Sequence, residues 1–256
     1  MVAALWRRWR EARALRQRAI PDALWQQVLD AYPFIARRSE ADRAALRRLC
    51  SLFLAEKEFT GAGGLQVTDD MAVAIAAQAC LPVLQLGLQA YDSFVGIVVH
   101  GDEVVAPREV MDDDGIVHAY DELLTGEAME GGPVMLAWAD VLAAGELAEL
   151  SYNVVIHEFA HVLDMADGQA DGVPPLPSSA ARQAWIDCID TEYQAFVARI
   201  DAGHDDTTLD PYGAEGVEEF FAVAAEGFFV SPEAMSHEHP ALYRLFADYF
   251  RQDPLA

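Results

Sequence analysis

Two histidines and a glutamate stand at close spacing in His157-Glu158-Phe159-Ala160-His161. Residues four apart share one face of an α-helix, so both imidazoles can bind a single metal ion. Glu158 then projects beside that ion, where its carboxylate can take a proton from a metal-activated water. A helix is expected here because apolar residues recur every three or four positions through residues 150–166. The motif therefore predicts a hydrolytic zinc site.

Such a site needs a third protein ligand and leaves its fourth position to water. Glu219 is favoured because it lies in a row of small residues on a predicted helix, residues 215–229, where a second helix can approach closely. A carboxylate in such a place is costly to bury without a cation. Asp210 is the main alternative, because some peptidases combine the same motif with a downstream aspartate and a Tyr-Gly turn. The further candidates are His204, Glu215, Glu218, Glu226, His237 and His239.

Neighbouring residues suggest supporting roles. Tyr212 is a candidate donor to the oxyanion of a tetrahedral intermediate, or a turn residue that packs its ring. Glu226 suits the orientation of a ligating histidine, or a surface position, whereas Glu218 is expected in solvent. Asp164 lies three residues after His161 and is expected either to orient an imidazole or to point to water.

Other clusters carry weaker signals. Residues 237–240, His-Glu-His-Pro, are expected in a loop that lacks a rigid scaffold for a metal. Residues 111–115 lack the full calcium-loop pattern and are expected to form a solvated turn. The three cysteines are widely spaced, which favours neither a disulfide framework nor a cysteine metal site and fits a reducing cytoplasm.

Composition narrows the function classes. The chain has 256 residues, 53% of them apolar, which is typical of a globular protein with a large core. Its net charge of -25 disfavours binding to nucleic acid, and no apolar run is long enough for a membrane helix. Of the 17 basic residues, 11 precede residue 49, and arginines interrupt every apolar run there, so no secretory signal is expected.

The remaining elements follow from periodicity and from Gly and Pro positions. Residues 1–58 predict helices, residues 61–64 a loop and residues 69–82 a buried helix. Residues 94–99, 104–105, 116–117 and 134–138 predict strands of one small sheet, and residues 143–146 separate the last strand from the metal-binding helix. Further helices are expected at residues 179–201 and 240–250. These elements predict an α+β fold in a single domain, residues 1–256, with residues 1–90 mainly helical and residues 91–256 holding the sheet and active-site helices.

The sequence also resembles the Mlc titration factor A family of bacterial zinc-dependent peptidases. The resemblance covers most of the chain and rests on LPVLQLGL at residues 81–88, GPVMLAW at 132–138, HEFAHVLD at 157–164, DPY at 210–212, EFFAV at 219–223 and QDPL at 252–255. It implies that His157, His161 and Glu219 bind one Zn2+ per chain, that Glu158 is the catalytic carboxylate, and that Tyr212 is the active-site tyrosine.

The same resemblance implies a zincin-like metallopeptidase core, related to the catalytic domain of anthrax lethal factor, in a cytoplasmic protein. It implies aminopeptidase activity with a regulatory role, and a transcriptional repressor of the Mlc type as a partner beside the peptide or protein substrate. An extended substrate is expected to pair with residues 133–139 as the edge strand.

Two other hypotheses remain at this stage. The protein could be a module that sequesters a regulatory protein and whose zinc is mainly structural. It could also be a latent peptidase whose site is covered by residues 168–177 or by the first helix. Glu158 argues against a purely structural zinc site, because such a site needs no base.

Overall fold

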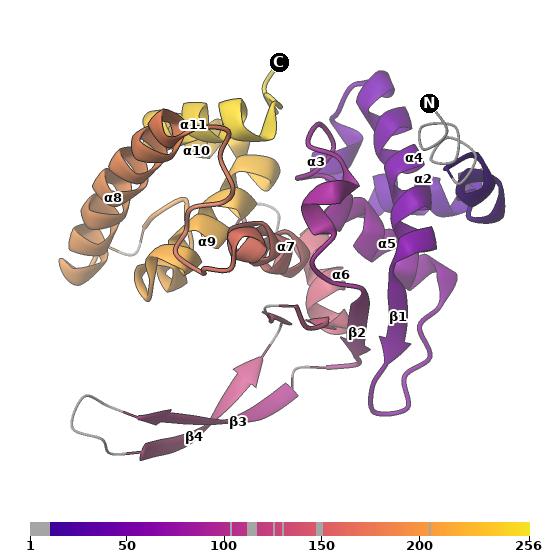
Figure 1. Cartoon of the computed structure of the whole chain (residues 1–256), viewed down its shortest axis with the longest axis horizontal. Helices are drawn as coiled ribbons and strands as arrows, with labels where there is room; N and C mark the ends of the chain where they lie inside the picture. The colour runs from indigo at the N-terminus through magenta and orange to yellow at the C-terminus, as the bar shows by residue number, and fades with distance from the viewer. Residues whose placement is uncertain are drawn as a thin grey trace.

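The computed structural model describes residues 11–102, 104–111, 117–124, 126–129, 131–146, 151–204 and 206–256. It has an α+β fold, which confirms the predicted class. Helix α7 (Val154–Asp164) lies in the middle, between the amino-terminal helices with the sheet and the carboxyl-terminal helices (Figure 1). Within the described ranges, no helix combines the length and apolar character needed to cross a lipid bilayer.

The amino-terminal portion is helical, as predicted. It contains α2 (Asp22–Ala31), α3 (Pro33–Ala36), α4 (Glu40–Glu56), α5 (Asp69–Cys80) and the 3-10 helix η1 (Leu88–Tyr91). Ser39 caps α4 by accepting a hydrogen bond from the backbone of Asp42, and α5 begins with two aspartates that suit the positive end of a helix. Residues 1–10, which include part of the predicted arginine-rich first helix, lie outside the described residues.

A small mixed sheet supports the central helix. Its strand order is β1 (Glu58–Gly61), β2 (Gly96–His100), β6 (Val134–Ala137) and β5 (Gly126–Ala128). The first three strands are parallel, and β5 pairs with β6 in the antiparallel direction. The predicted edge strand was wrong: β6 has neighbours on both sides, so the outer strand next to it is β5. Both β1 and β5 are short and have no alternating apolar pattern, which explains why periodicity did not reveal them.

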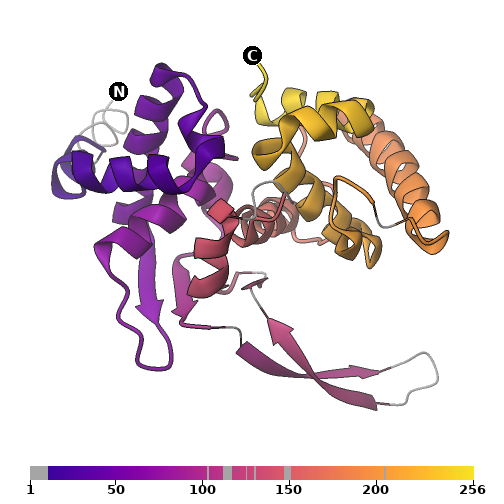
Figure 2. The ribbon, with the colours of Figure 1, turned by 180° about the vertical axis from the view of Figure 1, so that it is seen from behind.

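Two predicted strands do not join this sheet. Strands β3 (Val104–Met111) and β4 (Val117–Leu124) form a separate antiparallel ribbon that projects from the body of the molecule (Figure 2). Their register runs continuously from Val104↔Leu124 to Met111↔Val117. The two strands satisfy each other's backbone hydrogen bonds, so the prediction of one common sheet was wrong. The turn expected at residues 111–115 lies outside the described residues, apart from Met111.

Residues 143–146, predicted as a connection, belong instead to helix α6 (Trp138–Glu146). Gly145 explains the error. In isolation a glycine suggests a break in a helix, but a Cβ at Gly145 would lie 2.2 Å from the carbonyl oxygen of Ala31. This glycine allows α6 to pack closely against the end of α2.

The carboxyl-terminal portion is also helical. It contains the 3-10 helix η3 (Met165–Asp167), α8 (Ser179–Asp201), the 3-10 helix η4 (Pro211–Ala214), α9 (Val217–Val230), α10 (Pro232–Glu238) and α11 (Pro240–Phe250). The helices predicted at residues 179–201, 215–229 and 240–250 are confirmed. The loop predicted at residues 237–240 was wrong, because Pro232 and Pro240 each occupy the first position of a helix, where the missing N–H costs nothing.

The central helix is held by packing on two sides. Phe159 contacts the rings of Phe53, Tyr91 and Phe94, with centroids 5.8, 5.0 and 5.6 Å away. On its other side α7 packs against α9, whose residues from Phe220 to Val230 are all buried. Rigid packing of this kind sets the position of any side chain that α7 and α9 present to each other.

Candidate metal centre

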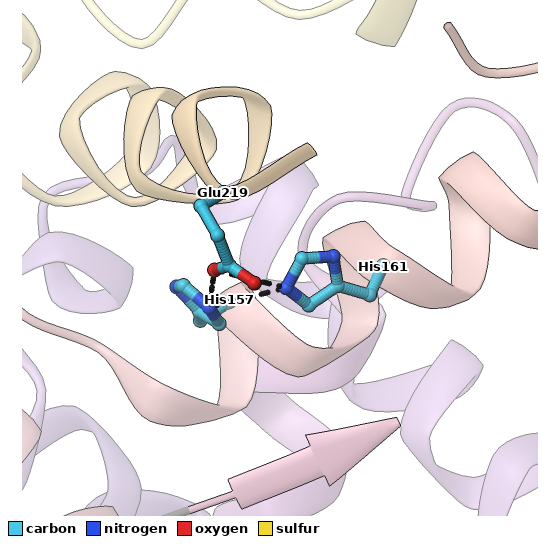
Figure 3. Close-up of side chains that lie close together, drawn as sticks. All are labelled: His157, His161 and Glu219. Carbon is cyan, nitrogen blue, oxygen red and sulfur yellow. Dashed lines mark hydrogen bonds and ion pairs between the residues drawn. The ribbon is translucent and has the colours of Figure 1, made fainter. Parts of the chain in front are cut away.

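Three potential ligand atoms converge where α7 faces the start of α9 (Figure 3). Nε2 of His157 lies 3.2 Å from Nε2 of His161, and Oε2 of Glu219 lies 3.1 and 3.4 Å from these two nitrogens. Zinc bonds of 2.0–2.1 Å in a tetrahedron place neighbouring ligand atoms about 3.3 Å apart. The separations therefore fit one zinc-sized ion with three protein ligands. Two imidazole nitrogens and one carboxylate are also a donor set found in catalytic zinc sites.

The local sequence places these three side chains. Asn153 caps α7 and accepts a hydrogen bond from the backbone of Ile156, so the helix starts one turn before His157. Glu219 lies in the first turn of α9, and its side chain points toward both histidines (Figure 3). The structure thus brings together the residues predicted as ligands.

Asp210, the alternative third ligand, is not in this group. Its carboxylate caps η4 and accepts a hydrogen bond of 2.9 Å from the backbone N–H of Tyr212. Because its carboxylate is used as a helix cap, Asp210 is not one of the three residues whose ligand atoms converge.

Glu226 orients one of the histidines, which was one of its two predicted roles. Its Oε1 lies 2.8 Å from Nδ1 of His157. When Nδ1 donates its proton to this carboxylate, Nε2 is left unprotonated and faces the other two ligand atoms. The second oxygen of Glu226 accepts a hydrogen bond from the backbone N–H of Asn153.

The charges of the cluster are strongly coupled. Burial by itself lowers the pKa of His157, but the carboxylates of Glu219 and Glu226 outweigh burial and raise this pKa well above its usual value. Burial acts to raise the pKa of Glu219, yet hydrogen bonds with both histidines bring it well below its usual value. A cation at this point, either a proton or a metal ion, is therefore strongly favoured.

Glu158 is buried beside the ligands, with 5% of its surface exposed. Burial raises its pKa, and the nearby histidines counteract this effect. Its carboxylate lies against Gly126 of β5, where a Cβ would approach Oε1 to 2.5 Å. A carboxylate whose pKa is raised is a better proton acceptor than an ordinary glutamate, which suits a residue that takes up and returns a proton.

Tyr212 lies next to the cluster in η4. Its ring centroid is 6.2 Å from that of His157, and 43% of its surface is exposed. The structure thus places the predicted tyrosine beside His157, with part of its side chain in solvent.

Asp164 neither contacts a histidine ring through a hydrogen bond nor points to solvent, so both of its predicted orientations were wrong. It is buried and accepts hydrogen bonds of 2.9 and 2.8 Å from the backbone N–H groups of Gly172 and Val173. Trp185 donates a further bond of 2.8 Å to the carbonyl of Gly172. The connection at residues 168–177 is thus tied to the end of α7, because a buried carboxylate needs such donors.

Residues 237–240 take part in contacts between helices. Glu238 pairs with Arg199 and accepts a 3.0 Å hydrogen bond from the backbone of Thr208, while His239 Nδ1 lies 2.9 Å from Glu192. These contacts join α10 and its junction with α11 to α8 and the residues that follow it.

Sequence reasoning missed two features of the site. Asn153 precedes an apolar helical run, which is the ordinary signal for a helix cap and could have been found. The contact between Gly126 and Glu158 has no local signal, because β5 reaches α7 through the tertiary fold.

A His-Glu-Xaa-Xaa-His helix with a carboxylate from a second helix is the donor arrangement of zinc metallopeptidases, and the fold places these parts together. A family profile described as "Glucose-regulated metallo-peptidase M90" matches residues 6–251. The chain belongs to this metallopeptidase family.

Individual relatives agree with this assignment. An uncharacterized protein of Synechocystis sp. is 37% identical over 253 residues, covering 98% of this chain and 90% of its own length. Mlc titration factor A of Pectobacterium atrosepticum is 35% identical, covering 91% of this chain and 87% of its own length. The protein of the same name from Serratia proteamaculans is 34% identical, covering 91% of this chain and 88% of its own length. The resemblance stated from sequence motifs is thereby confirmed.

Proposed function

We propose that this protein is a zinc-dependent peptidase whose ligands are His157, His161 and Glu219. The observation that carries the proposal is the separation of their three ligand atoms, 3.1 to 3.4 Å, which matches the edges of a zinc tetrahedron. The family assignment supports peptide bonds as the target.

The chemistry divides among few residues. A zinc ion held by His157, His161 and Glu219 would lower the pKa of a bound water and would polarise the scissile carbonyl. Glu158 takes the proton of the attacking water and delivers it to the leaving amine, a role supported by its burial next to both histidines. Tyr212, whose ring lies beside that of His157, donates a hydrogen bond to the developing oxyanion. Glu226 holds His157 in the tautomer that binds metal.

We further propose that an extended peptide pairs with β5. Among the residues that the structure describes, β5 pairs with β6 along one edge only. Gly126, the first residue of β5, lies against Glu158. A peptide added along the outer side of β5 would thus pass the catalytic carboxylate. This assignment replaces the edge strand expected at residues 133–139.

We also propose that the peptidase has a regulatory role. Relatives of this chain are named Mlc titration factor A, which supports a repressor of the Mlc type as a partner. We also propose the cytoplasm as the location. We propose aminopeptidase action as the dominant activity. The alternative is a module that sequesters such a repressor and whose zinc is mainly structural.

The test combines zinc analysis with a panel of peptides that carry either free or acetylated amino termini, with Glu158→Gln as the control protein. One zinc per chain and cleavage of free-amino peptides alone support an aminopeptidase. Equal cleavage of acetylated peptides would replace it with an endopeptidase. Zinc binding without cleavage in the wild-type protein, together with tight binding of a repressor, would favour the sequestering module.

A further inference from the structure

Buried hydrogen bonds lead from His157 to the amino-terminal helices. The side chain of Glu226 links Nδ1 of His157 to the backbone N–H of Asn153. The side-chain amide of Asn153 then donates a 2.8 Å hydrogen bond to Oε1 of Gln78, on α5. Gln78 in turn donates a 3.2 Å bond to the carbonyl of Ala74 and contacts the hydroxyl of Tyr32. These bonds connect α5, α7 and α9 at one point.

The linking residues are fully enclosed. Gln78 and Asn153 are both 0% exposed, and Glu226 is 4% exposed. An amide buried without partners is costly, but both side chains use their donors and acceptors within the network. A satisfied network in a region of low dielectric allows few alternative orientations.

The position of Gln78 needs an explanation beyond packing. Its neighbours along the buried part of α5 are apolar, mainly alanine, valine and isoleucine. A glutamine rarely occurs fully buried on such a helix, and a hydrophobic residue of similar size would fill the space at lower cost. The amide is matched to Asn153 and, through it, to the residue that orients His157.

We propose that Gln78 and Asn153 are positioning residues for the metal centre. Gln78 fixes Asn153, Asn153 fixes the start of α7 and one oxygen of Glu226, and Glu226 then holds the His157 ring. This inference rests on the proposed role of His157 as a metal ligand. It extends the metal site to α5, roughly 80 residues earlier in the chain.

The first test compares Gln78→Met with Gln78→Glu. Methionine keeps the length of the side chain but leaves the Asn153 amide without its acceptor. A buried, neutral glutamic acid keeps a carbonyl for Asn153 and an O–H for Ala74. Zinc affinity is measured by chelator competition and ligand geometry by the absorption spectrum of the cobalt-substituted protein. We expect about a tenfold loss of zinc affinity and an altered cobalt spectrum for Gln78→Met, and near wild-type values for Gln78→Glu.

The second test uses Asn153→Ser, alone and with Gln78→Met. Serine still caps α7 and keeps the backbone N–H for Glu226, but it removes the side-chain amide that donates a hydrogen bond to Oε1 of Gln78. Because both changes break one hydrogen bond, the double variant should lose little more zinc affinity than either single variant. Ile189→Ala, in the buried part of α8, controls for general loss of stability.

The outcomes separate this inference from the proposed function. Unchanged zinc affinity and cobalt spectrum in folded Gln78→Met and Asn153→Ser would overturn it. An equal loss in Ile189→Ala at matched thermal stability would also overturn it, since the effect would then be structural. If Gln78→Met does not fold, the zinc affinity and cobalt spectrum of Asn153→Ser are compared with those of Gln78→Glu. Equal values in these two variants would overturn the inference. If His157→Ala binds zinc as the wild type does, the proposed metal site itself fails.

Discussion

Gly126 and Glu158 touch across the boundary between the sheet and the central helix. A Cβ at Gly126 would meet Oε1, Cγ and Cδ of Glu158 at 2.5 to 2.8 Å. The absence of a side chain at Gly126 therefore provides the space in which the proposed base is held. Contacts this short force a flexible side chain to move, and small displacements at a reacting group have large kinetic effects.

Gly126→Ala should displace the carboxylate of Glu158 and lower kcat about 10- to 100-fold while zinc content stays at the wild-type level. Peptide cleavage and zinc analysis on the same preparation check this expectation. Gly101→Ala is the matched control, because a Cβ at Gly101 meets nothing within 4 Å. Wild-type kcat in Gly126→Ala would show that Glu158 does not need this space.

Glu158→Gln should keep one zinc per chain and lose cleavage by about 10²- to 10⁴-fold, because the amide cannot take a proton from water. Steady-state kinetics and zinc analysis measure the two effects separately. Full residual activity in this variant would contradict the assignment of Glu158 as the base.

Glu219→Ala should weaken zinc binding more than about 100-fold, which exceeds the usual effect of removing a residue that only orients a ligand. The matched control is Glu218→Ala, one residue earlier on α9, which should bind zinc normally. Asp210→Ala should also keep its zinc, because its carboxylate caps η4. Chelator competition gives all three affinities. Normal zinc binding in Glu219→Ala would move the third ligand elsewhere.

Asp164 should make stability depend on pH. Burial raises its pKa to about 6, against the opposing effect of the hydrogen bonds from Gly172 and Val173. The folded protein therefore holds this proton more tightly than the unfolded chain, whose aspartate has a pKa of about 3.9. As pH rises through the interval from about 4 to about 6, the unfolding free energy contributed by Asp164 falls.

Asp164→Asn should remove that dependence. The unfolding free energy of the variant minus that of the wild type should therefore increase between pH 4 and pH 7, whatever its sign at pH 4. Denaturant titrations over this range measure the difference, and Asp167→Asn, on the exposed end of the same segment, is the control. A difference that stays constant with pH would show that Asp164 is ionised throughout.

The sequence by itself predicted which residues gather in the candidate metal centre, and it predicted most of the helices. The spacing of His157 and His161, the caps and the apolar periodicity are local features, and hydrogen bonds within a helix join residues four apart. Even Glu219 could be predicted from its row of small neighbours on α9.

Tertiary structure decided which strand is the outer one next to the site and where Asp164 points. It also decided which residues hydrogen-bond, directly or in series, to the candidate ligand His157. Strand pairing, the contact of Gly126 with Glu158 and the bond between Gln78 and Asn153 all join residues far apart in the chain. No local pattern encodes such pairs, because each depends on how complete elements pack together.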